Sequence, residues 1–179
     1  MLHSFDESLH KSQQRAEMSY WPTIHRKRFP NLVSCKYVKK DGYRQRRGID
    51  RIIKLKNGQY IFIDEMDRDK NYPDLLFEQY SDTAKRTPGK IEKNILLCDF
   101  FAYNFLPEHR CYFFVYEELR RFWLRHKDYA IQRAEQRSGG FRVIWADNEK
   151  DGYQWVTKSI AVPFDFLLPR IEGTEIIDW

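Results

Sequence analysis

Three carboxylates flank a tight turn in the first half of the chain and could bind a hard metal ion. Asp50 precedes an alternating apolar run, and Asp64 and Glu65 follow a second apolar run after the Asn57-Gly58 turn. Carboxylate oxygens are the ligands that Mg²⁺ prefers in proteins. A bound Mg²⁺ or Mn²⁺ polarises a phosphate and lowers the pKa of the attacking water. The residue types therefore suit a site for a hard metal ion, which is one requirement of metal-assisted phosphodiester hydrolysis.

The register of this hairpin determines which carboxylates share a face of the sheet. Side chains alternate along a strand, so Asp64 and Met66 point one way and Glu65 points the other way. A two-residue turn at Asn57-Gly58 would set Asp50 opposite Glu65. A three-residue loop with its glycine left-handed would set Asp50 opposite Asp64. Both registers stay open at this point, because a slip of one residue exchanges the faces.

Basic residues gather just before the first of these acids. The net charge is +5 and the sequence pI is about 9.0, which is a moderate basic bias that suits a nucleic-acid partner. A charge run alone is often only a solvated loop. Its position beside the acids favours contact with phosphates. The candidate phosphate-binding residues are Lys36, Lys39, Lys40, Arg44, Arg46 and Arg47.

Several short motifs follow one another in an order that resembles a known family. They are Gln45-x-x-Gly48-Ile49-Asp50-Arg51, Ile63-Asp64-Glu65-Met66-Asp67-Arg68, Asp74-Leu75-Leu76-Phe77-Glu78, Pro88-Gly89 and Cys98-Asp99-Phe100-Phe101-Ala102-Tyr103. The chain resembles PD-(D/E)XK nuclease-like proteins of phages and bacteria over nearly its whole length. The resemblance implies an α/β (α+β) fold with a restriction-endonuclease-like core, in which helices flank a central mixed sheet.

The resemblance also implies roles for individual residues. Asp50 and Asp64 match the metal-binding acids, and the main-chain carbonyl of Glu65 would be a further ligand. The cofactor would be Mg²⁺ or Mn²⁺, and the substrate would be nucleic acid, with DNA favoured. Met66 takes the position of the family's lysine. Glu78 is either a further site acid or a member of a structural ion pair, since a buried glutamate needs a partner.

Met66 puts catalysis in question, because a thioether carries no charge and donates no hydrogen bond. Three explanations stay open. The lysine was replaced to trap an inactive form, the natural protein has lost catalysis, or Lys54, Lys70 or Lys93 has taken over the role. We therefore expect a nuclease with impaired catalysis. The alternative is an inactive nuclease-fold protein that binds nucleic acid or a partner protein, for example in phage defence or counter-defence.

Periodicity and turn signals predict one domain over residues 1–179. Helices are expected over residues 7–20, 21–29, 93–105, 117–137 and 164–171. Strands are expected over residues 32–37, 49–55, 60–63, 75–80, 110–116, 141–145 and 153–162. Asn57-Gly58 and Asp151-Gly152 are expected to close two hairpins.

The cysteines and histidines indicate the cellular location and argue against a metal site built from these residues. The three cysteines have no metal-type spacing, and their odd number argues for a reducing, cytoplasmic location. The five histidines are scattered and do not form a metal motif. The N-terminal residues do not form a signal peptide, and no apolar run approaches membrane-spanning length. A homodimer and a protein partner both stay open.

Overall fold

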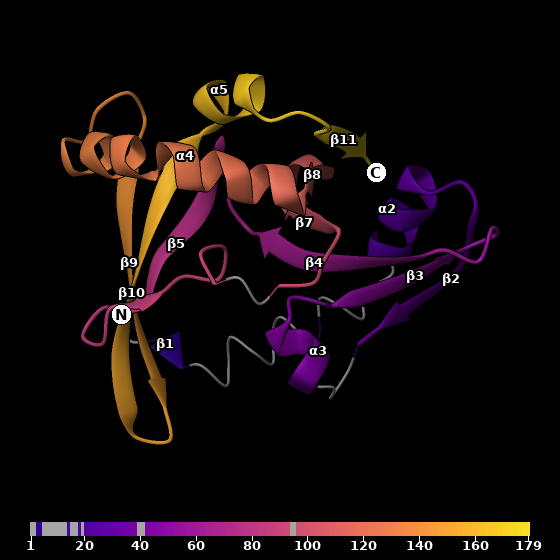
Figure 1. Cartoon of the computed structure of the whole chain (residues 1–179), viewed down its shortest axis with the longest axis horizontal. Coiled ribbons are helices and arrows are strands. Elements are labelled where there is room, and N and C mark those ends of the chain that lie inside the picture. Colours follow the sequence, from indigo (N-terminus) through magenta and orange to yellow (C-terminus); the bar gives the residue numbers. More distant parts are fainter. Residues whose placement is uncertain (1–2, 5–13, 15–17, 19, 39–41, 94–95) are drawn as a thin grey trace. The chain divides into compact units, whose positions relative to one another are not determined.

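The computed structural model of the chain describes residues 3–4, 14, 18, 20–38, 42–93 and 96–179 (Figure 1). They form a mixed α+β fold whose six-stranded mixed sheet is flanked by helices, which confirms the expected fold class. The chain divides into two compact units. Unit 1 comprises residues 1–11, 72–94 and 119–172, and unit 2 comprises residues 12–71, 95–118 and 173–179. The single domain expected over residues 1–179 stays a prediction.

Unit 2 contains the six-stranded sheet, in the order β11-β8-β7-β4-β3-β2. Strands β4 and β7 are parallel, and every other neighbouring pair in this sheet is antiparallel. Figure 1 shows β2, β3 and β4 side by side, with α2 nearby. The elements of unit 2 are α2 (Tyr20–Arg28), β2 (Leu32–Tyr37), α3 (Gly42–Arg46), β3 (Arg51–Leu55), β4 (Tyr60–Arg68), β7 (Phe100–Phe105), η1 (Leu106–Glu108), β8 (Arg110–Val115) and β11 (Glu175–Asp178).

The core of unit 2 forms where α2 packs on the sheet. Pro22 lies in the first turn of α2, where its missing N–H costs no hydrogen bond. Trp21 and Ile24 of this helix are buried and pack with apolar residues of the sheet, among them Ile53 and Phe113. Burying such side chains stabilises the unit by about 1.5–3 kcal/mol each.

The β3–β4 hairpin adopts the register of a three-residue loop. Leu55 N–H donates to the carbonyl of Gln59 over 2.9 Å, and Arg51 lies opposite Ile63. Gly58 has a φ of 86°, as a left-handed loop glycine requires. Of the two registers that the sequence leaves open, the structure therefore has the one of the three-residue loop, which sets the Asp50 end of β3 against Asp64 and not against Glu65.

The expected helix over residues 93–105 is wrong for its second half, which is β7. This strand lies between β4 and β8 and is buried from Phe101 to Phe105. A central strand buried on both faces is a continuous apolar run without alternation. Such a run cannot be distinguished from a buried helix by periodicity. Most of the expected helix over residues 7–20 lies outside the described residues.

Unit 1 contains a five-stranded sheet in the order β1-β9-β10-β5-β6. Figure 1 shows β9 and β10 as a long ribbon beside β5. Phe77 of β5 stacks on Trp123 of α4, with ring centroids 4.6 Å apart. The elements are β1 (His3–Ser4), β5 (Asp74–Asp82), β6 (Thr87–Pro88), α4 (Tyr116–Glu135, in this unit from Leu119), β9 (Arg142–Lys150), β10 (Tyr153–Pro163), α5 (Phe164–Leu167) and η2 (Leu168–Arg170).

Two glycine positions in unit 1 explain turn signals of the sequence. Asp151 and Gly152 have φ values of 51° and 77°, and they close the β9–β10 hairpin as expected. Gly89 lies against the main chain of β5, where an added β-carbon would be 1.7 Å from the carbonyl oxygen of Glu78. A side chain at position 89 would therefore force these segments apart. Within the described residues, no helix has the length and apolar character needed to cross a membrane.

Candidate functional site

Asp50 lies immediately before β3, and its carboxylate contacts β4. Asp50 N–H donates to the carbonyl of Ile63 over 2.9 Å, and Arg51 is also paired with Ile63. Two residues therefore oppose one, as in a β-bulge, and a bulge redirects the side chain. Asp50 Oδ2 accepts a hydrogen bond of 3.0 Å from Glu65 N–H. The carboxylate of Asp50 is thus held at the peptide that joins Asp64 to Glu65.

Asp64 is buried in β4, with 2% of its surface exposed, and lies opposite Phe101 of β7. Gly48 brings the main chain close to it. A β-carbon at position 48 would be 3.6 Å from Asp64 Oδ2 and 2.9 Å from Leu96 Cδ2. Gly48 also has a φ of 68°, which favours glycine. The segment from Gly48 to Asp50 therefore contacts β4 at the two adjacent acids, Asp64 and Glu65.

Glu65 points to the other face of β4 and forms a buried polar cluster. Its Oε1 lies 2.6 Å from His25 Nε2 and accepts a hydrogen bond of 2.9 Å from Arg51 Nε. Arg51 Nη2 donates to its Oε2 over 3.0 Å. Burial acts to raise the pKa of Glu65, but the hydrogen bonds from His25 and Arg51 outweigh burial and lower this pKa. The side chain of Glu65 is therefore committed to the core, and the predicted ligand role of its main-chain carbonyl stays a prediction.

A second polar chain follows Glu65 on the same face of β4. Asp67 accepts hydrogen bonds of 2.8 Å from Tyr20 Oη and from Asn104 Nδ2. Trp179 Nε1 donates to Asn104 Oδ1 over 2.8 Å. Burial raises the pKa of Asp67, although these hydrogen bonds oppose the shift. This chain ties α2, β4, β7 and the C-terminal segment together.

Neither of these two polar clusters was predicted from the sequence. The sequence signal that could have revealed them is the pair of acids at Glu65 and Asp67. These two residues are two positions apart in β4 and therefore lie on the same face of the strand, which faces α2. Carboxylates on such a face need cationic or hydrogen-bonding partners.

Met66 lies on the face of Asp64 and opposite Tyr103 of β7. It is half-buried. The guanidinium of Arg68, two residues further along the same face, lies 5.8 Å from the centroid of the Tyr103 ring. The position at which the resemblance predicts a lysine therefore lies two residues along the strand from the buried carboxylate, and an apolar thioether occupies it.

The three candidate substitute lysines lie in different places. Lys54 extends over the ring of Tyr60, 5.8 Å from its centroid, at the turn end of the hairpin. It lies four residue positions further along the chain than Asp50, a span of about 13 Å in an extended strand. Lys70 is exposed beyond β4. Lys93 belongs to unit 1 and its Nζ donates to Ser81 Oγ over 3.4 Å. Their catalytic role stays a prediction.

Part of the predicted phosphate-binding cluster forms a short helix beside Asp50. Arg44 and Arg46 are exposed on α3, and the guanidinium of Arg47 lies 5.1 Å from the Tyr43 ring centroid. Ile49 N–H donates to the Arg44 carbonyl over 3.1 Å, which fixes the end of α3 against the segment that leads to Asp50. Lys36 is exposed on β2, whereas Lys39 and Lys40 lie outside the described residues.

Glu78 belongs to β5 of unit 1. Its Oε1 accepts a hydrogen bond of 3.3 Å from Lys90 N–H. Burial raises the pKa of Glu78, while Lys90 and Lys93 partly oppose this shift. The predicted catalytic role of Glu78 stays a prediction.

The metal site expected from the sequence involves two carboxylates, those of Asp50 and Asp64. No group of three or more His, Cys, Asp or Glu side chains that could hold a metal occurs among the described residues. Mg²⁺ typically takes one or two carboxylates and keeps several waters, which a substrate phosphate can replace. The roles of Asp50 and Asp64 as ligands of Mg²⁺ or Mn²⁺ stay predictions.

Comparisons with protein-family models, with curated proteins and with solved structures found no match for this chain. The resemblance to PD-(D/E)XK nucleases therefore stays a prediction, and the case for function depends on the residues themselves.

Proposed function

We propose that the protein is a nuclease-type DNA-binding protein that holds Mg²⁺ or Mn²⁺ through Asp50 and Asp64 and whose catalysis is impaired by Met66. The supporting observation is the hydrogen bond from Glu65 N–H to Asp50 Oδ2, beside the buried Asp64. Because the Asp50 carboxylate is bound to the peptide that follows Asp64, it is in a suitable position to share a cation with the Asp64 carboxylate. When bound, the metal would polarise a phosphodiester.

The basic residues of α3 would hold the DNA backbone. Arg44 and Arg46 are exposed, and they lie within seven residues of Asp50 in the chain. Guanidinium groups bind phosphates in a bidentate way. Positive charge at this place would bring a phosphate towards the carboxylates and offset their repulsion of it.

Met66 would make the chemical step slow. A lysine beside the metal-binding acids would orient water and stabilise charge in the transition state, and the loss of one such group costs roughly a hundredfold or more in rate. Binding to DNA does not need this group. The second candidate function is an inactive nuclease-fold protein that binds nucleic acid. The presence of Met66 in place of a lysine also favours this function.

Restoring the lysine tests the proposal. Plasmid and single-stranded DNA are incubated with Mg²⁺ or Mn²⁺ and either the wild-type protein or Met66→Lys. We expect Met66→Lys to cleave at least about a hundredfold faster than wild type, because the ammonium would lie beside Asp64. Met66→Gln, which is polar but uncharged, is the matched control and should stay slow.

The metal ligands are tested in the same background. Adding Asp64→Asn to Met66→Lys should abolish the gain, whereas adding Asp147→Asn, at an exposed site in β9, should leave it unchanged. Failure of Met66→Lys to cleave with either metal would mean that the loss of a lysine does not explain inactivity. The inactive-binder function would then be preferred.

A further inference from the structure

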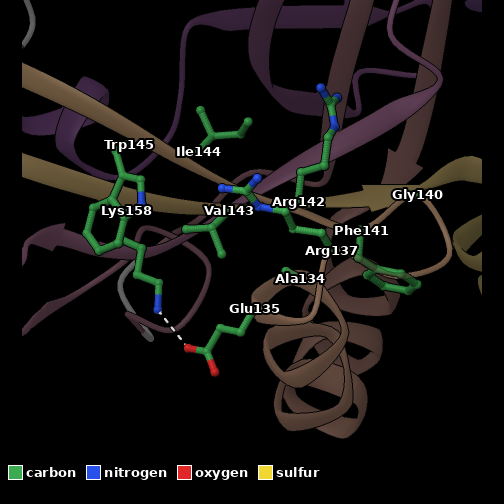
Figure 2. A pocket seen from close by; sticks show the side chains of 10 residues that line it. All are labelled: Ala134, Glu135, Arg137, Gly140, Phe141, Arg142, Val143, Ile144, Trp145 and Lys158. Carbon is green, nitrogen blue, oxygen red and sulfur yellow. Dashed lines mark hydrogen bonds and ion pairs between the residues drawn. The ribbon is translucent and has the colours of Figure 1, made fainter.

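A hollow in unit 1 combines an exposed indole with several cations. It has a volume of about 710 Å³ and lies between the C-terminal end of α4 and the start of β9 (Figure 2). We call it the Trp145 pocket. The side chains that matter for the argument are Glu135, Arg137, Phe141, Arg142, Trp145 and Lys158. Pockets of this size accommodate small organic ligands, including one nucleotide.

The aromatic wall of the pocket is held in place by charged neighbours. Trp145 is 59% exposed and lies opposite Lys158 in the β9–β10 ladder. Lys158 Nζ lies 5.5 Å from the indole centroid and 3.3 Å from Glu135 Oε1. Figure 2 shows Trp145 and Lys158 together on one side, with Glu135 joined to Lys158. The indole is thus positioned with much of its surface open to solvent.

Arg137 occupies a backbone position that normally favours glycine. Ser138 N–H donates to the carbonyl of Arg133 and Arg137 N–H donates to that of Ala134, which is the hydrogen-bond pattern of a Schellman helix end. Arg137 has a φ of 50°. An arginine in this left-handed position is strained relative to glycine. What places the guanidinium in the argument is its location, because Arg137 is exposed and lines the pocket.

A second hollow continues the same chemistry. It has a volume of about 740 Å³ and shares Gly140, Phe141 and Arg142 with the Trp145 pocket. Tyr129 and Arg133 also line it, and the Tyr129 ring is 46% exposed. Aromatic rings and guanidinium groups therefore line both adjoining hollows, and the shared Arg142 is ion-paired with Asp74. Single-stranded nucleic acid presents the complementary groups, which are flat bases and anionic phosphates.

We propose that the Trp145 pocket binds single-stranded nucleic acid, with one unpaired base stacked on Trp145 and a neighbouring phosphate held by Arg137. A base inside a duplex is stacked on its neighbours and cannot cover the indole, so the pocket selects single strands. The inference goes beyond the proposed nuclease function, because it needs neither Asp50, Asp64 nor a metal. It assigns nucleic-acid binding to unit 1 by itself.

The test measures binding of a fluorescent dT20 oligonucleotide by anisotropy in EDTA, with a 20-base-pair duplex for comparison. Trp145→Ala should weaken dT20 binding about tenfold, and Trp145→Phe should restore most of it, because any aromatic ring can stack on a base. Trp155→Ala is the matched control, since residues 145 and 155 lie on opposite faces of the ribbon. It should bind as wild type does.

Arg137→Gly provides a second variant that the fold accommodates. It should weaken dT20 binding several-fold and reduce the salt dependence of binding by about one phosphate contact. Equal binding of dT20 by wild type and Trp145→Ala would overturn the proposal. Equally tight binding of a polyglutamate peptide would also overturn it, because the pocket would then be a general anion or protein site.

The same assay separates this inference from the proposed nuclease function. Adding Trp145→Ala to Met66→Lys should weaken dT20 binding in EDTA as it does in wild type and should leave plasmid cleavage unchanged. Weakened dT20 binding in a protein that does not cleave would contradict the nuclease function alone. Unchanged dT20 binding would overturn the role of the Trp145 pocket alone.

Discussion

Adjacent acids in β4 have different environments, because alternate residues of a strand face opposite ways. Asp64 lies beside Gly48 on the face of Met66, whereas Glu65 bonds to His25 and Arg51 in the core. The carboxylates of Asp64 and Glu65 thus have different roles. One is available for the proposed metal chemistry, and the other stabilises the sheet that holds it.

Replacing Glu65 by Gln should change stability in a pH-dependent way. The pKa of Glu65 is lowered in the folded protein, so its stabilising contribution is present above the unfolded pKa of about 4.3 and declines as pH falls through the folded pKa. We expect Glu65→Gln to cost about 3 kcal/mol at pH 7, because it leaves buried Arg51 without its counter-charge. Urea unfolding at pH 7, 5, 4 and 3.5 measures this difference.

The difference in unfolding free energy between wild type and Glu65→Gln should shrink below about pH 5. Glu117→Gln, at an exposed position of α4, serves as the control. A difference that stays constant from pH 7 to 3.5 would contradict the assignment of the lowered pKa to Glu65.

Among the elements, those with local signals were predicted well from the sequence. β2 begins and ends at the expected residues, and the Asn57-Gly58 and Asp151-Gly152 turns close hairpins. The bulge at Asp50 was not predictable, because the sequence carries no mark of the hydrogen bond from Asp50 N–H to Ile63. Strand β7 was mistaken for a helix, since its parallel partner β4 is distant in sequence and a strand buried on both faces lacks the alternation of a half-buried one.

The helix end at Arg137 gives a prediction about stability. Arg137→Gly should raise the free energy of unfolding by about 0.5–1 kcal/mol, because glycine adopts the left-handed conformation without a steric penalty. Gly139→Ala is the opposite control. Its φ is 63°, so an added methyl group should lower stability by about 1 kcal/mol. Chemical denaturation measures both changes, and a destabilised Arg137→Gly would mean that the arginine supports the helix end.

At the scale of the whole molecule, the net charge of +5 favours association with polyanions, and it leaves the location of the contact open. In unit 2 we propose α3 as this contact, because its exposed arginines precede Asp50. The sequence indicated the positive net charge and showed that basic residues precede Asp50. It could not indicate that Glu65 faces the core, because that depends on contacts with α2.

Duplex DNA binding should depend on salt through α3. The triple variant Arg44→Gln, Arg46→Gln, Arg47→Gln should lower the slope of log K against log salt by about 2–3, since each phosphate contact contributes about 0.9. Lys56→Gln, in the exposed hairpin loop, should leave the slope unchanged. A titration from 50 to 300 mM NaCl measures it. An unchanged slope in the triple variant would place the duplex contact elsewhere.

The sheet of unit 2 receives its edge strand, Glu175–Asp178, from the far end of the sequence. During synthesis, β2, β3 and β4 leave the ribosome first, and all of unit 1 is translated before β11 exists. The outer edge of β8 therefore has no partner strand while the more than fifty residues between β8 and β11 are synthesised. A translation stall in that interval would leave nascent chains with an open hydrogen-bonding edge, which is where chaperone capture or aggregation would begin.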